Sequence, residues 1–189
     1  MGSLTRFPLG TLVDQGVSCF IETGTYLGDS LAYAAQFPFQ TLYSIECAPE
    51  RVVRARERFA ADPRVTILAG DSAVELPRLL TQLGGVPVAC WLDAHYPEQG
   101  EPVIVLPLAA ELDALVAYPG IAQSVLFVDD RRVYEAFPEN ALPEGYERGD
   151  PALFDDVATR LLATHVLERL GGAQGYGVFV PRAWAISFA

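Results

Sequence analysis

Three carboxylates end two apolar runs of this sequence. Asp93 closes the run VACWLD (88–93), and Asp129 with Asp130 closes the run SVLFVDD (124–130). Short runs of this kind predict strands that are buried on both faces, and folding rarely requires a charge where such a strand ends. Open α/β sheets bind their ligands beyond the carboxyl ends of the strands, so the three carboxylates indicate a site at one edge of a sheet.

A glycine turn follows the first apolar run, VSCFIE (17–22). The segment ETGTYLGDS (22–30) holds two glycines, Gly24 and Gly28, between this strand and the next helix. Gly24 would let the backbone approach a ligand, and Gly28 would let the next helix pack closely on the sheet. The turn is not GxGxxG, and the acids around it would repel a pyrophosphate. The residues therefore favour a cofactor that carries a positive charge and no phosphates.

Two more strand ends carry candidate cofactor ligands. Glu46 ends TLYSIE (41–46), where a carboxylate can accept hydrogen bonds from both hydroxyls of a ribose. Asp71 and Ser72 follow VTILAG (65–70) and are placed to border an adenine. Each signal alone occurs in many α/β proteins. Their order and spacing together are much more specific for a site that binds a nucleoside cofactor.

Helices are predicted between these strands. Pro49 begins one of them, with an apolar stripe that includes Val52 and Ala55 and with the arginines of this segment on the other faces as solvated charge. Ser72 and Glu75 match a capping box at the start of the next helix, which Gly84-Gly85 ends. Further helices are expected over 30–37 and 106–118 and, with Asp150 as N-cap, in the segment LFDDVATRLLAT.

The runs HVLERL (165–170) and YGVFVPR (176–182) are joined by GGAQG and predict an antiparallel hairpin. Alternation of strands and helices before them predicts a parallel sheet with helices on both sides. The expected fold is therefore α/β, with a single doubly wound, mostly parallel seven-stranded sheet, helices on both faces and a C-terminal antiparallel hairpin.

Composition limits the function. The 189 residues predict one domain, 1–189, and the formal net charge of −11 opposes binding to a phosphate backbone, so we expect no nucleic-acid partner. No run has the length of a membrane helix, and the N-terminus lacks a signal-peptide core. We therefore expect a cytoplasmic protein without a membrane partner. All 13 basic residues are arginine, which excludes a lysine base. Three cysteines without CxxC spacing are expected to be buried and reduced.

The segments FIETGTYLGDS, LYSIE, ILAGDS, CWLDAH and LFVDD, in this order, resemble the class I S-adenosylmethionine-dependent methyltransferases over residues 17–134. The resemblance implies S-adenosylmethionine as cofactor. By position it places Glu22, Gly24, Tyr26 and Ser30 at the methionine part of the cofactor, with Gly28 in the same turn, Glu46 at the ribose, Asp71 and Ser72 at the adenine, and Asp93 near the sulfonium.

Within that family the sequence is most similar to the catechol-type, Mg²⁺-dependent O-methyltransferases. Those enzymes take one metal carboxylate from the end of strand four and an Asp-Asp or Asp-Asn pair from the end of strand five. Asp93, Asp129 and Asp130 occupy these places. Three carboxylates suit Mg²⁺, Mn²⁺ or Ca²⁺, which would lower the pKa of an acceptor hydroxyl. Alternatively, Asp130 pairs with Arg131 or Arg132, or caps a following turn.

The resembled enzymes often use a lysine near the strand-four aspartate as their base, and this chain has none. His95, two residues past Asp93, is the replacement candidate because the unperturbed pKa of histidine is about 6.5. Asp93 and His95 are thus the predicted catalytic residues, although a single histidine after a strand is also common as a structural hydrogen bonder. His165 is interpreted as structural.

The leading hypothesis is a methyltransferase that acts on a hydroxyl of a small molecule with the help of a divalent metal. The alternatives are a metal-independent N- or O-methyltransferase and a non-catalytic nucleoside-binding domain. A nicotinamide oxidoreductase is disfavoured by the missing GxGxxG. The acceptor is expected to be the partner, and a homodimer stays open.

Overall fold

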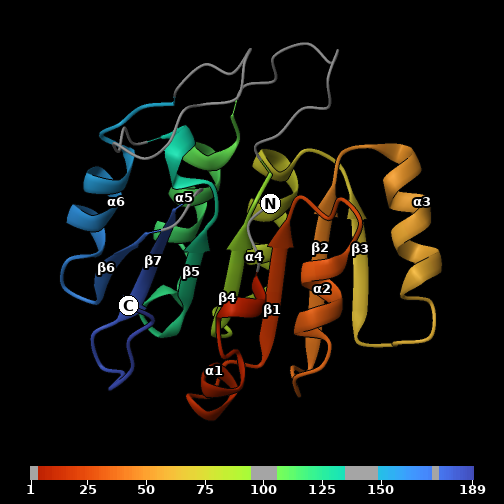
Figure 1. Cartoon of the computed structure of the whole chain (residues 1–189), viewed down its shortest axis with the longest axis horizontal. Helices are drawn as coiled ribbons and strands as arrows, with labels where there is room; N and C mark the ends of the chain where they lie inside the picture. The colour runs from red at the N-terminus through yellow and green to blue at the C-terminus, as the bar shows by residue number, and fades with distance from the viewer. Residues whose placement is uncertain (1–3, 95–105, 135–148, 172–174) are drawn as a thin grey trace.

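The computed structural model of the chain describes residues 4–94, 106–134, 149–171 and 175–189 (Figure 1). Its centre is a seven-stranded sheet in the order β3-β2-β1-β4-β5-β7-β6. The strands are β1 (Cys19–Thr23), β2 (Thr41–Glu46), β3 (Val65–Ala69), β4 (Val88–Leu92), β5 (Val125–Val128), β6 (His165–Leu170) and β7 (Tyr176–Pro181). Neighbouring strands from β3 to β5 are parallel, whereas β7 runs antiparallel to both β5 and β6. The predicted sheet and its C-terminal hairpin are confirmed.

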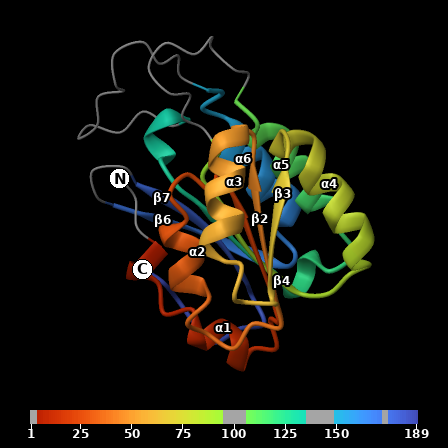
Figure 2. The same cartoon turned by 90° about the vertical axis from the view of Figure 1, so that its right-hand side faces the viewer.

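Helices cover both faces of the sheet (Figure 2). The α-helices are α1 (Gly10–Asp14), α2 (Asp29–Ala34), α3 (Pro49–Arg58), α4 (Ser72–Leu83), α5 (Leu108–Val116) and α6 (Leu153–Leu161), and the 3₁₀ turns are η1 (Leu4–Arg6), η2 (Ile121–Gln123) and η3 (Arg131–Val133). Buried residues of α1, α2 and α3 belong to one hydrophobic core, and those of α4, α5 and α6 belong to the core on the other face. The sheet is therefore doubly wound, as predicted.

The central strands are buried on both faces because their side chains are almost entirely apolar. Every residue of β1, β4 and β5 is buried, whereas β3 and β6 at the sheet edges are partly exposed. Parallel strands under two helical layers have this pattern, and their carboxyl ends all meet at one edge. In a sheet of this kind, a polar residue directly after a central strand faces that edge.

The helix predicted to begin at Ser72 does begin there, but two predicted helix caps were wrong. The N-cap of α4 is Asp71, whose carboxylate accepts a hydrogen bond from the backbone N–H of Ala73 at 2.9 Å, while Glu75 pairs with Arg78. An aspartate one residue earlier thus takes the place of the expected Ser72 capping box. Asp150 accepts a hydrogen bond from Ala152, but this closes a turn and α6 begins only at Leu153. Gly84, in the left-handed region at φ 63°, ends α4 as predicted.

Cysteine burial differs from expectation at one position. Cys19 and Cys90 are buried, and burial raises the pKa of the Cys19 thiol to about 11. Cys47 is exposed, because it lies just beyond the end of β2 and not inside the strand. Among the described residues, no helix is long and apolar enough to cross a membrane.

Candidate functional site

The glycine turn after β1 lies between the carboxyl ends of β2 and β4. The backbone N–H of Gly24 donates to Ile45 of β2 at 2.9 Å. On the other side, a Cβ added to Gly24 would lie 2.5 Å from the carbonyl oxygen of Asp93, and the φ of Gly24 is +82°. A glycine is required here for both reasons. The close approach that it permits is to the backbone of β4, which brings the predicted cofactor turn and Asp93 together.

Glu46 closes the β2 side of the site. Its Oε2 accepts the backbone N–H of Tyr26 at 2.9 Å, and its Oε1 accepts the N–H of Ala48 at 3.0 Å. The residue is 4% exposed, and Tyr26 has a left-handed φ of 48°. Because each carboxylate oxygen has two lone pairs, these bonds leave acceptor capacity for hydroxyls of a ligand. Glu46 thereby holds the shape of the turn and retains the chemistry predicted for a ribose.

Glu22 supports the same turn from inside. It is buried and accepts a 2.6 Å hydrogen bond from the hydroxyl of Ser44, which in turn lies 2.6 Å from the hydroxyl of Thr25. Burial raises the pKa of Glu22 to about 8, and the bond from Ser44 and the charge of Glu46 are smaller influences of opposite sign. Glu22 is therefore protonated at neutral pH. Its role at the methionine part of a cofactor stays a prediction.

Four further predicted residues lie in this turn, in α2 and beyond β3. Gly28 has a φ of +80°, and a Cβ there would lie 2.9 Å from the ring of Phe59, so the glycine makes room for α3 and not for closer packing on the sheet. Ser30 lies in the first turn of α2 and is partly exposed. At the end of β3, Asp71 is exposed and Ser72 is buried. Their predicted contacts with adenine stay predictions.

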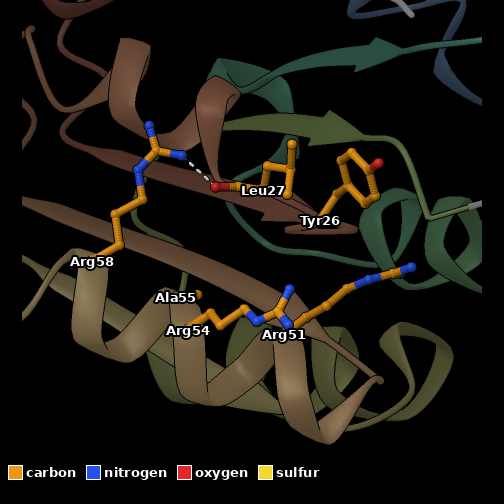
Figure 3. A pocket seen from close by; sticks show the side chains of 6 residues that line it. All are labelled: Tyr26, Leu27, Arg51, Arg54, Ala55 and Arg58. Atoms are coloured by element: carbon orange, nitrogen blue, oxygen red, sulfur yellow. Dashed lines mark hydrogen bonds between the residues drawn. The ribbon is translucent and has the colours of Figure 1, made fainter.

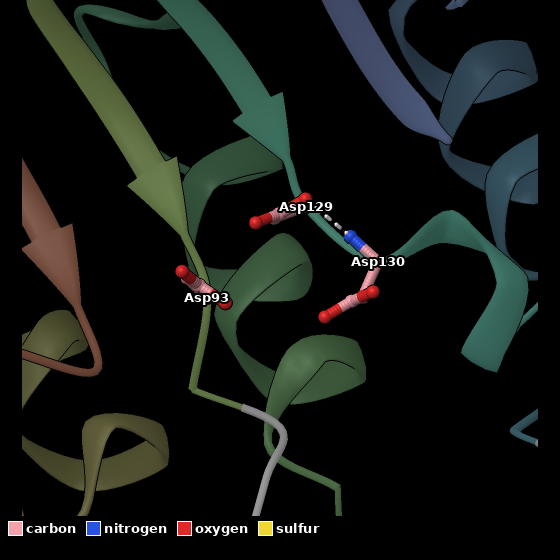
Figure 4. A group of neighbouring side chains, drawn as sticks. All are labelled: Asp93, Asp129 and Asp130. Carbon is pink, nitrogen blue, oxygen red and sulfur yellow. Dashed lines mark hydrogen bonds between the residues drawn. The ribbon is translucent and has the colours of Figure 1, made fainter. Parts of the chain in front are cut away.

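Asp93, Asp129 and Asp130 meet at the ends of β4 and β5 (Figure 4). One carboxylate oxygen of each lies within 4.8 Å of the others. Oδ1 of Asp129 accepts the backbone N–H of Asp130 at 2.7 Å, whereas its buried Oδ2 has no hydrogen-bond partner among the described residues. Trp91 donates from its indole N–H to Oδ2 of Asp93 at 3.3 Å. The convergence expected from two strand ends is present.

Burial and mutual repulsion dominate the electrostatics of this cluster. Burial raises the pKa of Asp93 well above its ordinary value, and the charges of Asp129, Asp130 and Glu22 raise it further. Burial and then the charge of Asp130 raise the pKa of Asp129 to about 7, against smaller opposing contributions that include Arg132. A buried group of carboxylates with one orphaned oxygen favours a ligand that brings positive charge.

The donor set fits a hard divalent cation, because Mg²⁺, Mn²⁺ and Ca²⁺ prefer carboxylate oxygens. The alternative pairing is also present, since Nε of Arg132 lies 2.9 Å from Oδ1 of Asp130. The two are compatible, because the ion pair uses one oxygen of Asp130. Asp130 has a left-handed φ of 48°, which turns its carboxylate back toward Asp93 (Figure 4).

The sequence analysis missed Glu111 of α5. It is fully buried, and its carboxylate oxygens make no hydrogen bond of good geometry to any described residue. Burial raises its pKa to about 7, and the nearby Ser72 and Thr23 hydroxyls lower it by less. Glu111 shares the buried stripe of α5 with Leu108 and Leu115. An acid at a core position of an amphipathic helix was the available signal.

Two histidines were singled out from the sequence. His95 lies outside the described residues, so its role as a base stays a prediction. His165 hydrogen-bonds through Nε2 to the carbonyl of Ser124 at 2.9 Å and through Nδ1 to the hydroxyl of Thr164 at 2.9 Å. Burial lowers its pKa. These bonds across the sheet agree with the structural role that was predicted for His165.

No profile of a known protein family matches the chain, and no curated protein matches it. Solved structures of methyltransferases do. SAH-bound methyltransferase PaMTH1 of Podospora anserina is 17% identical with a TM-score of 0.64, over 94% of this chain and 83% of that one. A putative caffeoyl-CoA O-methyltransferase of Staphylococcus aureus is 14% identical with a TM-score of 0.64, over 96% and 84%. A putative methyltransferase of Escherichia coli, yhhF, is 12% identical with a TM-score of 0.58, over 97% and 88%. The chain has the Rossmann-like fold of these methyltransferases.

Proposed function

We propose that this chain is an S-adenosylmethionine-dependent methyltransferase that methylates a hydroxyl of a small molecule with the help of a divalent cation. The observation that carries the proposal is the row of carboxylates along one sheet edge. Glu46 is the last residue of β2, Asp93 and Asp129 directly follow β4 and β5, and Glu22 lies next to the end of β1. The sulfonium of the cofactor is a cation. A cation beside these carboxyl groups favours their ionised form and is in turn stabilised by them.

Methyl transfer is a displacement at carbon, so catalysis depends mainly on alignment of the acceptor oxygen with the methyl group. The acceptor oxygen forms the new bond to the methyl carbon as the sulfonium sulfur leaves with the electron pair of the breaking bond. Gly24 fixes the turn against Asp93, and Glu46 holds the backbone of Tyr26. In this proposal the rigid β1–β2 side orients the cofactor, and the β4–β5 side orients the acceptor.

The acceptor hydroxyl must lose its proton. His95 is the proposed base, and Asp93 is the proposed catalytic carboxylate between cofactor and acceptor. Asp93, Asp129 and Asp130 would hold the cation, which supplies Lewis acidity that lowers the pKa of the hydroxyl. The orphaned Oδ2 of Asp129 is the feature of the described residues that best supports a cation there.

Calorimetric titration tests both halves of the proposal. S-adenosylmethionine and its demethylated product are titrated into the protein with Mg²⁺ and with a chelator. We expect micromolar binding of both, and tighter or more exothermic binding with Mg²⁺. Absence of any cofactor binding would contradict the methyltransferase proposal and leave the non-catalytic domain. Glu57 is exposed on α3, so a Glu57→Gln variant serves as the control for the effect of one unit of net charge on binding.

The ion pair between Arg132 and Asp130 favours a second candidate, a metal-independent N- or O-methyltransferase. Here Arg132 would supply the positive charge, and the aspartates would orient an amine or hydroxyl directly. Cofactor binding that does not change between Mg²⁺ and chelator would select this candidate over the first. An Arg132→Gln variant separates the two candidates further. It should weaken binding at the site only if Arg132, and not a metal ion, supplies the positive charge.

A further inference from the structure

Three of the four arginines of α3 lie around one pocket (Figure 3). The pocket has a volume of about 270 Å³ and is lined by Tyr26, Leu27, Arg51, Arg54, Ala55 and Arg58. The fourth arginine of the helix, Arg56, turns away and donates to the carbonyl of Ile67 at 3.0 Å. Arg54, Arg56 and Arg58 are exposed, as predicted for solvated charge, whereas Arg51 is partly buried because the β1 turn folds back over this helix.

Two of the pocket arginines are held in place by neighbours. Arg58 donates to the carbonyl of Leu27 and pairs with Asp29 at 2.8 Å. The guanidinium of Arg51 lies 5.1 Å from the centre of the Tyr26 ring, and its Nη1 is 4.0 Å from Glu46. Each of these two guanidiniums thus has a carboxylate nearby and a fixed direction.

Arg54 is different. Its side chain extends over the pocket between the other two arginines (Figure 3), and within the described part of the chain it makes no hydrogen bond or ion pair. Glu46 and Asp29 offset the charges of Arg51 and Arg58, so the charge of Arg54 has no counterpart around the pocket. In a chain with a net charge of −11, such a concentration of arginine is a local exception.

We propose that this pocket binds a phosphate group, with Arg54 as its principal ligand and with Arg51 and Arg58 beside it. Guanidinium groups offer paired N–H donors that match the geometry of phosphate oxygens. Tyr26 and Leu27, which are 45% and 53% exposed, form an apolar wall for an organic group on the phosphate. S-adenosylmethionine has no phosphate, so this site lies beyond the proposed function and does not depend on it.

Titration of the free protein with inorganic phosphate at low ionic strength, without cofactor, tests the proposal. We expect one saturable site in the wild type and an affinity at least about tenfold weaker in Arg54→Gln, since a charged hydrogen bond is lost. The matched control is Arg78→Gln, which removes the same charge from an exposed residue of α4 and should bind as the wild type does. Arg54 is exposed and unpaired, so its replacement leaves the fold intact, which thermal unfolding verifies.

Phenyl phosphate distinguishes a phosphate ester from free phosphate as the source of the group. An ester gains contacts with Tyr26 and Leu27, and affinity above that of inorganic phosphate assigns the site to an ester. Equal affinity assigns it to free phosphate. The absence of saturable binding of both probes, or equal binding by the wild type and Arg54→Gln, would overturn the proposal. None of these results depends on whether the chain binds S-adenosylmethionine.

Discussion

The two halves of the sheet edge are built in different ways. At the β1–β2 end, Glu46 accepts two backbone N–H groups and Glu22 accepts the Ser44 hydroxyl, so the buried acids have partners within the fold. At the β4–β5 end, three aspartates share a small space, and within the described part of the chain Oδ2 of Asp129 has no hydrogen-bond partner.

The β1–β2 end therefore has a geometry fixed by hydrogen bonds, whereas the β4–β5 end holds carboxylates that repel one another. Buried polar groups that are fully hydrogen-bonded stabilise a unique geometry, whereas buried carboxylates that repel one another cost free energy until a cation arrives. The β1–β2 end can therefore position a ligand without rearrangement. At the β4–β5 end, repulsion among the three aspartates would make binding of a cation favourable.

The largest expected effect comes from breaking the contact that joins the two ends. Gly24→Ala places a Cβ 2.5 Å from the Asp93 carbonyl at a φ of +82°. Strain and overpacking together should lower the free energy of unfolding by about 4 kcal/mol. Gly16→Ala is the control, because Gly16 has a φ of +90° but nothing within 4 Å of its added Cβ. Chemical denaturation should show a loss of only about 1 kcal/mol for Gly16→Ala. Equal losses would contradict the close contact.

Glu111 sharpens the comparison, because this buried acid lies near the Thr23 and Ser72 hydroxyls but makes no hydrogen bond of good geometry to a described residue. The pKa of Glu111 is raised by burial from 4.5 to about 7, so the folded protein keeps a proton that the unfolded chain loses. The stability that this proton provides is complete below pH 4.5 and is lost as the pH rises to 7, by about 3 kcal/mol. Glu111→Gln should remove that loss in denaturation measured across this range. Glu57→Gln, on the exposed face of α3, should show the same loss of stability with rising pH as the wild type.

Glu46→Gln tests whether the β1–β2 end is prepared for a cofactor. A glutamine has one acceptor oxygen and one amide N–H₂, so it cannot accept from both Tyr26 and Ala48. We expect the dissociation constant of S-adenosylmethionine in calorimetry to rise at least about tenfold, or about 1.4 kcal/mol. An unchanged dissociation constant would remove Glu46 from the cofactor site.

Asp129→Asn tests the charge repulsion among the aspartates at the β4–β5 end. Asparagine keeps the Oδ1 acceptor for the backbone of Asp130 and removes one of three like charges. At pH 8, above the pKa of about 7, we expect the metal-free variant to be more stable than the wild type by about 1 kcal/mol. Stabilisation by Mg²⁺ in thermal unfolding should disappear at the same time. Asp113→Asn breaks an exposed ion pair with Arg160 and should instead be neutral or slightly destabilising.

The sequence predicted the elements well where apolar periodicity was strong. All seven strands and the antiparallel hairpin were expected, and strand ends located Glu46, Asp93 and Asp129 at a common edge. The cap of α4 was misassigned because Asp71 and Ser72 are both good N-cap residues, and only the backbone geometry selects one of them. Glu111 was missed because an acid on a helix is ordinarily a solvated residue.

By itself the sequence determined the order of strands and helices and the chemistry at each strand end, because both depend on local patterns of residue type. Which side chains meet was decided by the tertiary structure. The approach of Gly24 to Asp93, the orphaned oxygen of Asp129 and the gathering of three arginines over Tyr26 all join segments far apart in the chain. Such contacts depend on how the turns cross the sheet edge, and no local pattern of residues specifies that path.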